Sequence, residues 1–177
     1  PSPGFMPTTA GESFFAASGS NIQHLADGSW ILVSGGKKSC IYFSNSRIPL
    51  LMTQGRETTG ANSIAINPSD SHQAFIVGGD FKHDTVQAGN SLLIQMNPFS
   101  QKSPITPPHG YRSCVEYIND HQLICCGTSG VDISNDGGLH WTLISDKSFH
   151  VCRKSKTGNT VFLAGSHGAI AQWRPAL

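Results

Sequence analysis

Charge is scarce in this sequence and is almost evenly divided between the two signs. Lys, Arg, Asp and Glu make up 13% of the 177 residues, and the formal net charge is +1. Binding to nucleic acid requires a basic face or stripe. The basic pair Lys37–Lys38 is interpreted as a solvated turn. The composition therefore predicts no nucleic-acid partner.

Long apolar runs are also missing. No segment approaches the roughly 20 apolar residues that a transmembrane helix needs, so we expect no transmembrane segment. Residues 1–13 have neither the basic start nor the apolar centre of a signal peptide. Because the chain starts at Pro1 rather than Met, we expect it to be a processed or truncated piece, with residues 1–10 as an irregular leader.

Signatures of cofactors and metals are absent as well. The sequence has no G-x-G-x-x-G that opens a helix, and "SGGKKS" is interpreted as a glycine turn between strands. Asp80, His83 and Asp84 form the one local cluster of possible ligands, which we interpret as a polar loop. The five cysteines have no C-x-x-C spacing, and Cys125–Cys126 are expected to pack as small hydrophobes. We predict no cofactor, no metal and no disulfide framework.

What the sequence does contain is a repeat. Hydrophobic residues make up 38% of the chain and glycine occurs 19 times, while no segment shows a sustained helical period. Instead, four apolar runs, "SWILVSGG", "QAFIVGGD", "QLICCGTSG" and "TVFLAGSHG", each lead into a glycine turn. They recur at intervals of roughly 40–50 residues, which is typical of a β-propeller with several strands in each unit.

The residues around each run complete the unit. A strand is expected before each run, at 13–18, 62–66, 113–117 and 149–153, with a turn rich in Gly, Asn and Asp between the two. A third strand is expected after each run. The sequence therefore predicts an all-β propeller over 11–177, with about four blades of four-stranded antiparallel sheet at 11–55, 56–108, 109–146 and 147–177. Room for a fourth strand is lacking in the last blade. A four-bladed ring and a part of a six- or seven-bladed ring both fit, and we favour the larger ring, partly because the chain does not start with Met. A larger ring would need a closing strand from elsewhere, since open blade edges are prone to aggregate.

One short motif stands out, S-x-D-x-G-x-x-W, formed by Ser134, Asp136, Gly138 and Trp141. It lies between two expected strands, "GVDIS" and "WTLIS", so "NDGG" is predicted to be a hairpin turn. We expect Asp136 to accept hydrogen bonds from backbone amides and Trp141 to bury its ring while its N–H finds a partner. The motif is therefore predicted to be structural.

This motif resembles the Asp-box, or BNR repeat, of sialidase-like propellers. The stretches "GESFFAASGSNI", "VSGGKKSCIYFS" and "PPHGYRSCVEY" further resemble a bacterial group of BNR-repeat proteins, often labelled "oxidoreductase" or "photosystem II stability/assembly factor-like". The resemblance runs from Gly11 to Trp173 and matches the later part of those longer proteins. It implies a β-propeller, and because members often look exported, a periplasmic or secreted location.

The repeat also predicts a ligand site. In a propeller the first strand of each blade lines the central channel. Residues near the start of these strands are expected to converge at the channel mouth, with two more on the same rim. The six candidates are Glu12, Asn62, Asp80, Tyr111, Arg112 and His150. A charge, an amide and an imidazole could then meet one ligand.

The favoured function is a non-catalytic binding or assembly module for a protein partner or for a small polar or carbohydrate ligand. The alternative is an enzyme, either an oxidoreductase or a sialidase-like glycosidase, with its active site at the channel mouth; we lean towards no catalysis. No catalytic residue is assigned, because the five arginines suggest no carboxylate-binding triad. The sequence does not decide the oligomeric state.

Overall fold

Strands dominate the structure. The computed structural model describes residues 8–17, 19–25, 27–43 and 46–174, and within them it contains sixteen strands and one 3-10 turn at Ser166–Gly168. These ranges contain no α-helix, and no helix in them has the length and apolarity of a membrane span. The prediction of an all-β fold is confirmed.

The largest sheet has nine strands in the order β5-β4-β3-β6-β7-β8-β9, and β1 and β2 also pair with β3. A single residue pair, Gly35 with Gly60, joins β3 to β6. A Cβ atom on Gly60, whose φ is +106°, would lie 2.5 Å from the Cα of Gly35, so this close approach requires glycine. The strands are β1 (Glu12–Ser13), β2 (Ile22–His24), β3 (Trp30–Gly36), β4 (Cys40–Phe43), β5 (Ser46–Pro49), β6 (Thr59–Asn67), β7 (Asp70–Asp80), β8 (Ser91–Met96) and β9 (Phe99–Lys102).

Two smaller sheets follow. One has four antiparallel strands in chain order, and the other has three. Their strands are β10 (Cys114–Tyr117), β11 (Leu123–Gly127), β12 (Gly130–Ser134), β13 (Thr142–Ser145), β14 (Val151–Lys154), β15 (Val161–Ala164) and β16 (Ile170–Trp173). Apart from the junction at Gly35, the chain thus makes successive hairpin units: β2–β5, β6–β9, β10–β13 and β14–β16.

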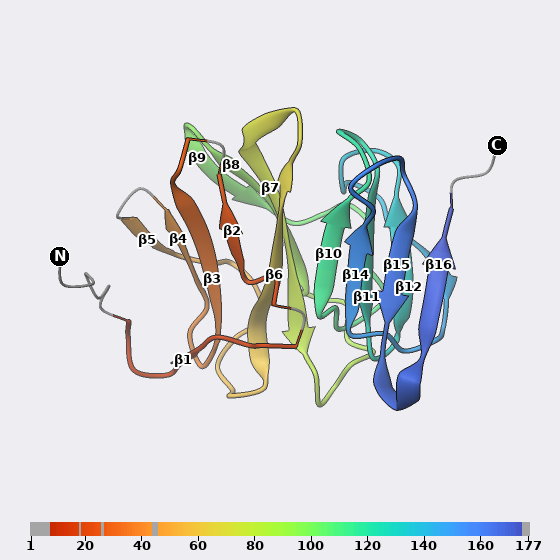
Figure 1. The fold of residues 1–177 in the computed structure, drawn as a ribbon. Coiled ribbons are helices and arrows are strands. Elements are labelled where there is room, and N and C mark those ends of the chain that lie inside the picture. The colour runs from red at the N-terminus through yellow and green to blue at the C-terminus, as the bar shows by residue number, and fades with distance from the viewer. Residues whose placement is uncertain (1–7, 18, 26, 44–45, 175–177) are drawn as a thin grey trace, which may run out of the picture.

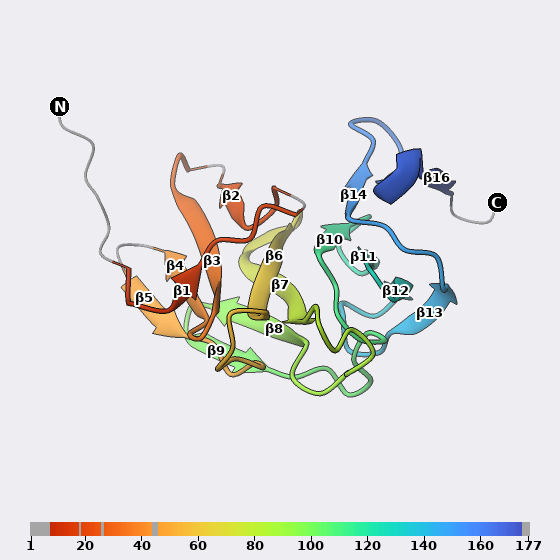
Figure 2. The same cartoon turned by 90° about the horizontal axis from the view of Figure 1, so that it is seen from below.

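These units stand side by side, with β1–β9 on one side and β10–β16 on the other (Figure 1). Seen from below, the first strands of the units, β2, β6, β10 and β14, lie on the inside of an arc (Figure 2). The strand β10 contacts both β6 and β14, and β2 contacts β6. The arc therefore brings residues that are far apart in sequence to one concave surface.

The core fills the spaces between the units. One buried cluster, including Ile31 and Ile64, lies between β2–β5 and β6–β9. Phe75 and Leu123 belong to a second cluster between β6–β9 and β10–β13, and Ile124 belongs to a third that includes β14 and β15. Leu123 and Ile124 face opposite sides because strand side chains alternate. The strand β11 is therefore covered on both faces, which explains its continuous apolar sequence.

The positions of three of the four expected first strands are confirmed, by β6, β10 and β14. The strand expected at 13–18 is wrong, since β1 covers only Glu12–Ser13 and β2, at Ile22–His24, takes the first place in its unit. The turn at Asp27–Gly28 explains this difference. Leu25 and Ser29 are bonded across it, so the paired strand must end directly before the turn. The apolar run of 13–18 lies too far upstream.

Candidate functional site

The S-x-D-x-G-x-x-W motif forms the turn between β12 and β13. Ser134 Oγ contacts Asp136 Oδ1 at 2.9 Å and accepts a hydrogen bond from the amide of Gly138. The carboxylate of Asp136 accepts the amide of His140 at 2.9 Å. The indole N–H of Trp141 donates to the carbonyl of Gly138 at 3.0 Å. The polar groups of the motif are thus satisfied within the turn itself.

Trp141 connects this turn to the neighbouring unit. Its side chain is buried, and its ring centroid lies 5.0 Å from that of Phe75 in β7. A tilted aromatic pair at this separation stabilises a packed interface beyond the area it buries. The turn therefore holds the units β6–β9 and β10–β13 together.

The six ligand candidates from the sequence lie at one end of the units. Tyr111 and Arg112 precede β10, His150 precedes β14, and Asn62 lies in the first half of β6. Arg112 is fully buried beside Asp132, to which its Nε donates at 2.6 Å. The other guanidinium contacts include the carbonyl of Tyr111 and the hydroxyl of Ser129, both at 2.8 Å. The charge of Arg112 is therefore neutralised inside the protein.

Glu12 is held in the same way. Its side chain is buried, and it contacts the Tyr42 hydroxyl and the Arg47 guanidinium, whose Nε lies 2.9 Å from Oε1. Burial alone would raise the pKa of Glu12, but the hydrogen bonds from Tyr42 and Arg47 outweigh it and leave the pKa lowered. This carboxylate stays ionised and paired.

The remaining candidates are also tied to neighbours. Asn62 accepts a hydrogen bond from the Tyr111 hydroxyl at 3.0 Å, so the structure brings these two together. Asp80 contacts His83 Nδ1 at 2.8 Å; burial opposes ionisation, but the hydrogen bonds from His83 and Thr58 lower the pKa of Asp80 to about 2. His150 Nε2 contacts the Ser166 hydroxyl at 2.6 Å. A ligand role for the six stays a prediction, and no open pocket that we describe unites them.

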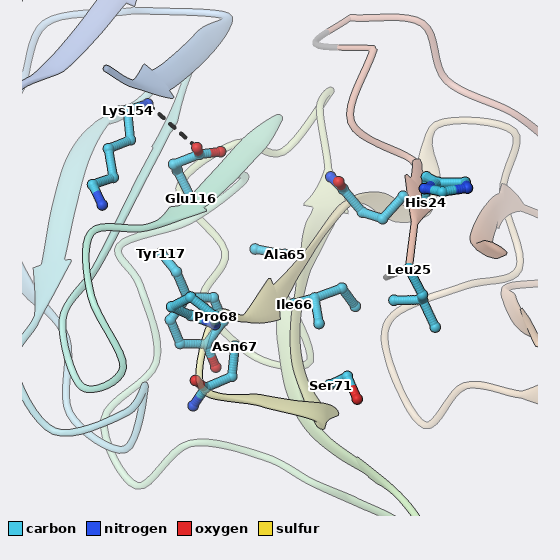
Figure 3. Close-up of a pocket in the computed structure, with 11 residues that line it drawn as sticks. His24, Leu25, Ala65, Ile66, Asn67, Pro68, Ser71, Glu116, Tyr117 and Lys154 are labelled. Atoms are coloured by element: carbon cyan, nitrogen blue, oxygen red, sulfur yellow. Dashed lines mark hydrogen bonds between the residues drawn. The ribbon is translucent and has the colours of Figure 1, made fainter. Parts of the chain in front are cut away.

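An open pocket lies at the other end of the units. It has a volume of about 370 Å³. All four first strands or the turns after them contribute to it, so it occupies the concave side of the arc. Figure 3 shows Ala65 and Ile66 of β6 between two walls, with His24 and Leu25 on one side and Glu116, Tyr117 and Lys154 on the other. We call it the mouth pocket; its lining is Gln23, His24, Leu25, Ala65, Ile66, Asn67, Pro68, Ser71, Glu116, Tyr117 and Lys154.

Glu116 is the acidic group of the mouth pocket. Burial raises the pKa of Glu116, while the charge of Arg153 and a hydrogen bond from the Lys154 amide act in the opposite direction. The Arg153 guanidinium donates to Oε2 at 3.2 Å, and the Lys154 amide donates to Oε1 at 3.3 Å. The carboxyl group is thus fixed in position and only partly neutralised.

Other polar groups of the mouth pocket are open to a ligand. Within the described part of the chain, the amino group of Lys154 makes no hydrogen bond or ion pair. It points away from the Glu116 carboxylate (Figure 3). His24 is exposed on the facing wall, and burial raises the pKa of Tyr117. The pocket can therefore hold a ligand by one cation, one carboxyl group and neutral donors.

Sequence reasoning missed this pocket because it considered the starts of the first strands. The ends of the same strands carry His24, Asn67, Tyr117 and Lys154, each directly before a hairpin turn. The polar residue at this repeated place was the available signal.

The described side chains give little support for a metal site, a disulfide or an arginine site for a substrate carboxylate. No group of three or more His, Cys, Asp or Glu in the described ranges is arranged to hold a metal ion. All five cysteines are buried and free. Four arginines are within reach of a carboxylate, so they are not free to grip a substrate acid: Arg47 with Glu12, Arg56 with Asp80, Arg112 with Asp132 and Arg153 with Glu116.

Comparison with known proteins gives a match at the level of the fold. No family model matches the sequence, and no curated protein matches it. Among solved structures, "YCF48 bound to D1 peptide" aligns with a TM-score of 0.60 and 15% identity, over 97% of this chain and 54% of that one. This chain therefore spans about half the length of that protein. The matched protein is a BNR/Asp-box β-propeller and a photosystem II assembly factor, so the resemblance expected from the Asp-box is confirmed in the fold.

Proposed function

We propose that this chain is a non-catalytic β-propeller module that binds a segment of a partner protein in the mouth pocket. The observation that carries the proposal is the pocket itself: it lies where the four first strands converge, and Lys154, whose amino group is unpaired, and His24 line its two opposite walls. Pockets that combine an apolar floor with a few convergent polar groups are typical binding sites. The matched structure contains a peptide bound to its protein, which supports a protein segment as the ligand here.

The module is proposed to consist of four blades, 11–55, 56–108, 109–146 and 147–177, within a larger ring. Two sheet faces support a larger ring. On the first unit, Ile22 and Trp30 are 52% and 37% exposed, and on the last unit Phe162 and Ile170 are 49% and 80% exposed. Large apolar groups gathered at both ends of the arc fit faces that further blades would cover.

A glycosidase-like hydrolase at the mouth pocket is the second candidate. Glu116 favours it, because a raised carboxyl pKa is typical of a general acid. Such enzymes use a pair of carboxylates across the scissile bond, and Glu116 is the only acidic side chain in the pocket lining as described. The binding function therefore accounts better for the arrangement.

Site-specific photo-crosslinking tests the proposal. A photoreactive residue replaces His24 in the mouth pocket, or His167, which is exposed at the opposite end. We expect crosslinks from position 24 to one recurring protein segment, and none to that segment from position 167. Lys154→Glu should reduce the crosslink, whereas Lys156→Glu, in the exposed turn after β14, should not. Equal crosslinking from both ends, or indifference to Lys154→Glu, would contradict the proposal.

A periplasmic or secreted location is proposed as well, on the resemblance to exported proteins. The five buried free thiols are compatible with it, because no exposed thiol is available for mispairing. Cell fractionation of the producing organism tests this, and recovery of the protein with cytoplasmic markers would contradict it.

A further inference from the structure

An apolar surface with acidic borders lies outside the mouth pocket. A cavity of about 420 Å³ lies between the second and third units, with Leu93 and Leu139 in its lining. Leu139 is 41% exposed, and the neighbouring Ile105, whose amide donates to the Leu139 carbonyl, is 71% exposed. Exposed large apolar side chains gathered in this way mark interaction surfaces.

The carboxylates of this cavity have only histidines as basic neighbours. Its lining includes three aspartates, Asp70, Asp120 and Asp136, one histidine, His121, and no lysine or arginine. Each aspartate lies near an imidazole nitrogen, at 3.4 Å for His72, 3.4 Å for His121 and 2.7 Å for His140. The aspartate side chains are 39%, 46% and 41% exposed, so each can contact both solvent and a bound molecule. We call this surface the acidic groove, defined by Asp70, Leu93, Asp120, Asp136 and Leu139.

The acidic groove is continuous with the mouth pocket. Asn67 lines both cavities. A smaller cavity between them shares Tyr117 with the mouth pocket, and it shares Gln73, Leu93 and Gly137 with the groove. A single extended chain could therefore pass from the concave side of the arc over Tyr117 and Leu93 towards Leu139.

The geometry points to an extended, basic segment of a partner protein as the occupant of the acidic groove. Its lysine or arginine side chains face Asp70, Asp120 and Asp136, and an apolar side chain between them packs on Leu93 and Leu139. Lys102, which pairs with Leu93 across β8 and β9, borders the smaller cavity only. An acidic segment would meet three carboxylates whose only basic neighbours are the histidines His72, His121 and His140, and complementary charge selects partners in this way. The inference rests on the proposed function in one respect, namely that the ligand is a protein segment.

Fluorescence anisotropy with defined peptides tests this inference on the intact chain. The probe is a labelled, capped peptide of alternating lysine and leucine, and its counterpart has glutamate in place of lysine. We expect only the lysine peptide to bind, and more weakly as salt increases. Asp120→Asn should weaken binding about threefold and Asp120→Lys about tenfold, as expected for exposed charge pairs.

Asp146→Lys is the matched control, because Asp146 is exposed and borders neither cavity. It should leave binding unchanged. Three results would overturn the proposal that the acidic groove binds a basic segment. They are failure of the lysine peptide to bind, equal binding of the two peptides, and equal effects of Asp120→Lys and Asp146→Lys.

Crosslinking from position 24 in the same samples separates the two proposals. If a peptide crosslinks at position 24 and its binding is unchanged by Asp120→Lys, only the proposal for the acidic groove is contradicted. A peptide that is sensitive to Asp120→Lys but never crosslinks at position 24 supports the groove and contradicts the mouth pocket.

Discussion

The buried pair of Arg112 and Asp132 yields the sharpest prediction for stability. Both side chains are fully buried, and Asp132 is also bonded by the ring and the amide of His109, at 2.9 and 3.3 Å. Replacing Arg112 by Met leaves the Asp132 carboxylate buried beside His109 alone. Removing one partner of a buried ion pair costs about 3–5 kcal/mol, a large part of the roughly 5–15 kcal/mol that stabilises a domain. Asp132→Asn alone leaves the Arg112 charge without its counter-ion and should cost a similar amount.

The double variant Arg112→Met with Asp132→Asn tests this reasoning. The asparagine still accepts the His109 amide, and no charge remains buried, so the double variant should be more stable than the sum of the single losses predicts. We expect a coupling of about 2 kcal/mol or more in the free energy of unfolding, measured by urea denaturation with the fluorescence of the buried Trp141. If the two single losses add up to the loss of the double variant within about 0.5 kcal/mol, a buried, mutually neutralising pair is refuted.

Three more predictions test other parts of the structure. Gly138→Ala should destabilise the protein by clearly more than the roughly 1 kcal/mol expected for Gly137→Ala, because both have positive φ but only the new Cβ at 138 would lie 2.5 Å from the Phe75 ring; equal losses would contradict the packing of the turn on β7. Burial raises the pKa of Glu116. At pH values just above the unfolded pKa of about 4.5, this carboxyl group is therefore protonated more often in the folded state than in the unfolded state. Its contribution to stability falls as pH rises through that window. Glu116→Gln should remove that fall, and parallel profiles of unfolding free energy against pH for the two proteins would contradict it. The five thiols should resist iodoacetamide in the native state and react after denaturation, since all are buried and burial raises the pKa of Cys40 to about 11; rapid native labelling, measured by mass spectrometry, would refute their burial.

Most of the strands were predictable from the sequence because hairpins are local. Runs such as "QAFIVGGD" and the turns beside them fix their own pairing, and β7 and β11 lie where these runs indicate. The strand β2 was not predicted because it has only three residues and includes Gln23 and His24. The apolar residues of 13–18, in contrast, have the composition of a strand. Apolarity identifies a candidate strand, but adjacency to the turn decides which segment pairs.

The site was less predictable because it depends on contacts between units. Arg112 has the chemistry of a ligand-binding residue, and its partner Asp132 lies 20 positions away on β12. A charged residue among the buried residues of "GVDIS" was a usable signal, since a buried carboxylate needs a cation. No local feature of the sequence indicates that the ends of the first strands, rather than their starts, surround an open pocket.

Amide hydrogen exchange tests the central claim most directly. The protein segment recovered by crosslinking from position 24 is synthesised as a peptide, and exchange of the full chain is followed with and without it. We predict slower exchange at 22–25, 65–68 and 116–118 at the mouth pocket, and unchanged exchange at 111–113 and 148–150 at the opposite end. Protection confined to 111–113 and 148–150 would contradict the account and would return the binding site to the end that holds Arg112 and His150.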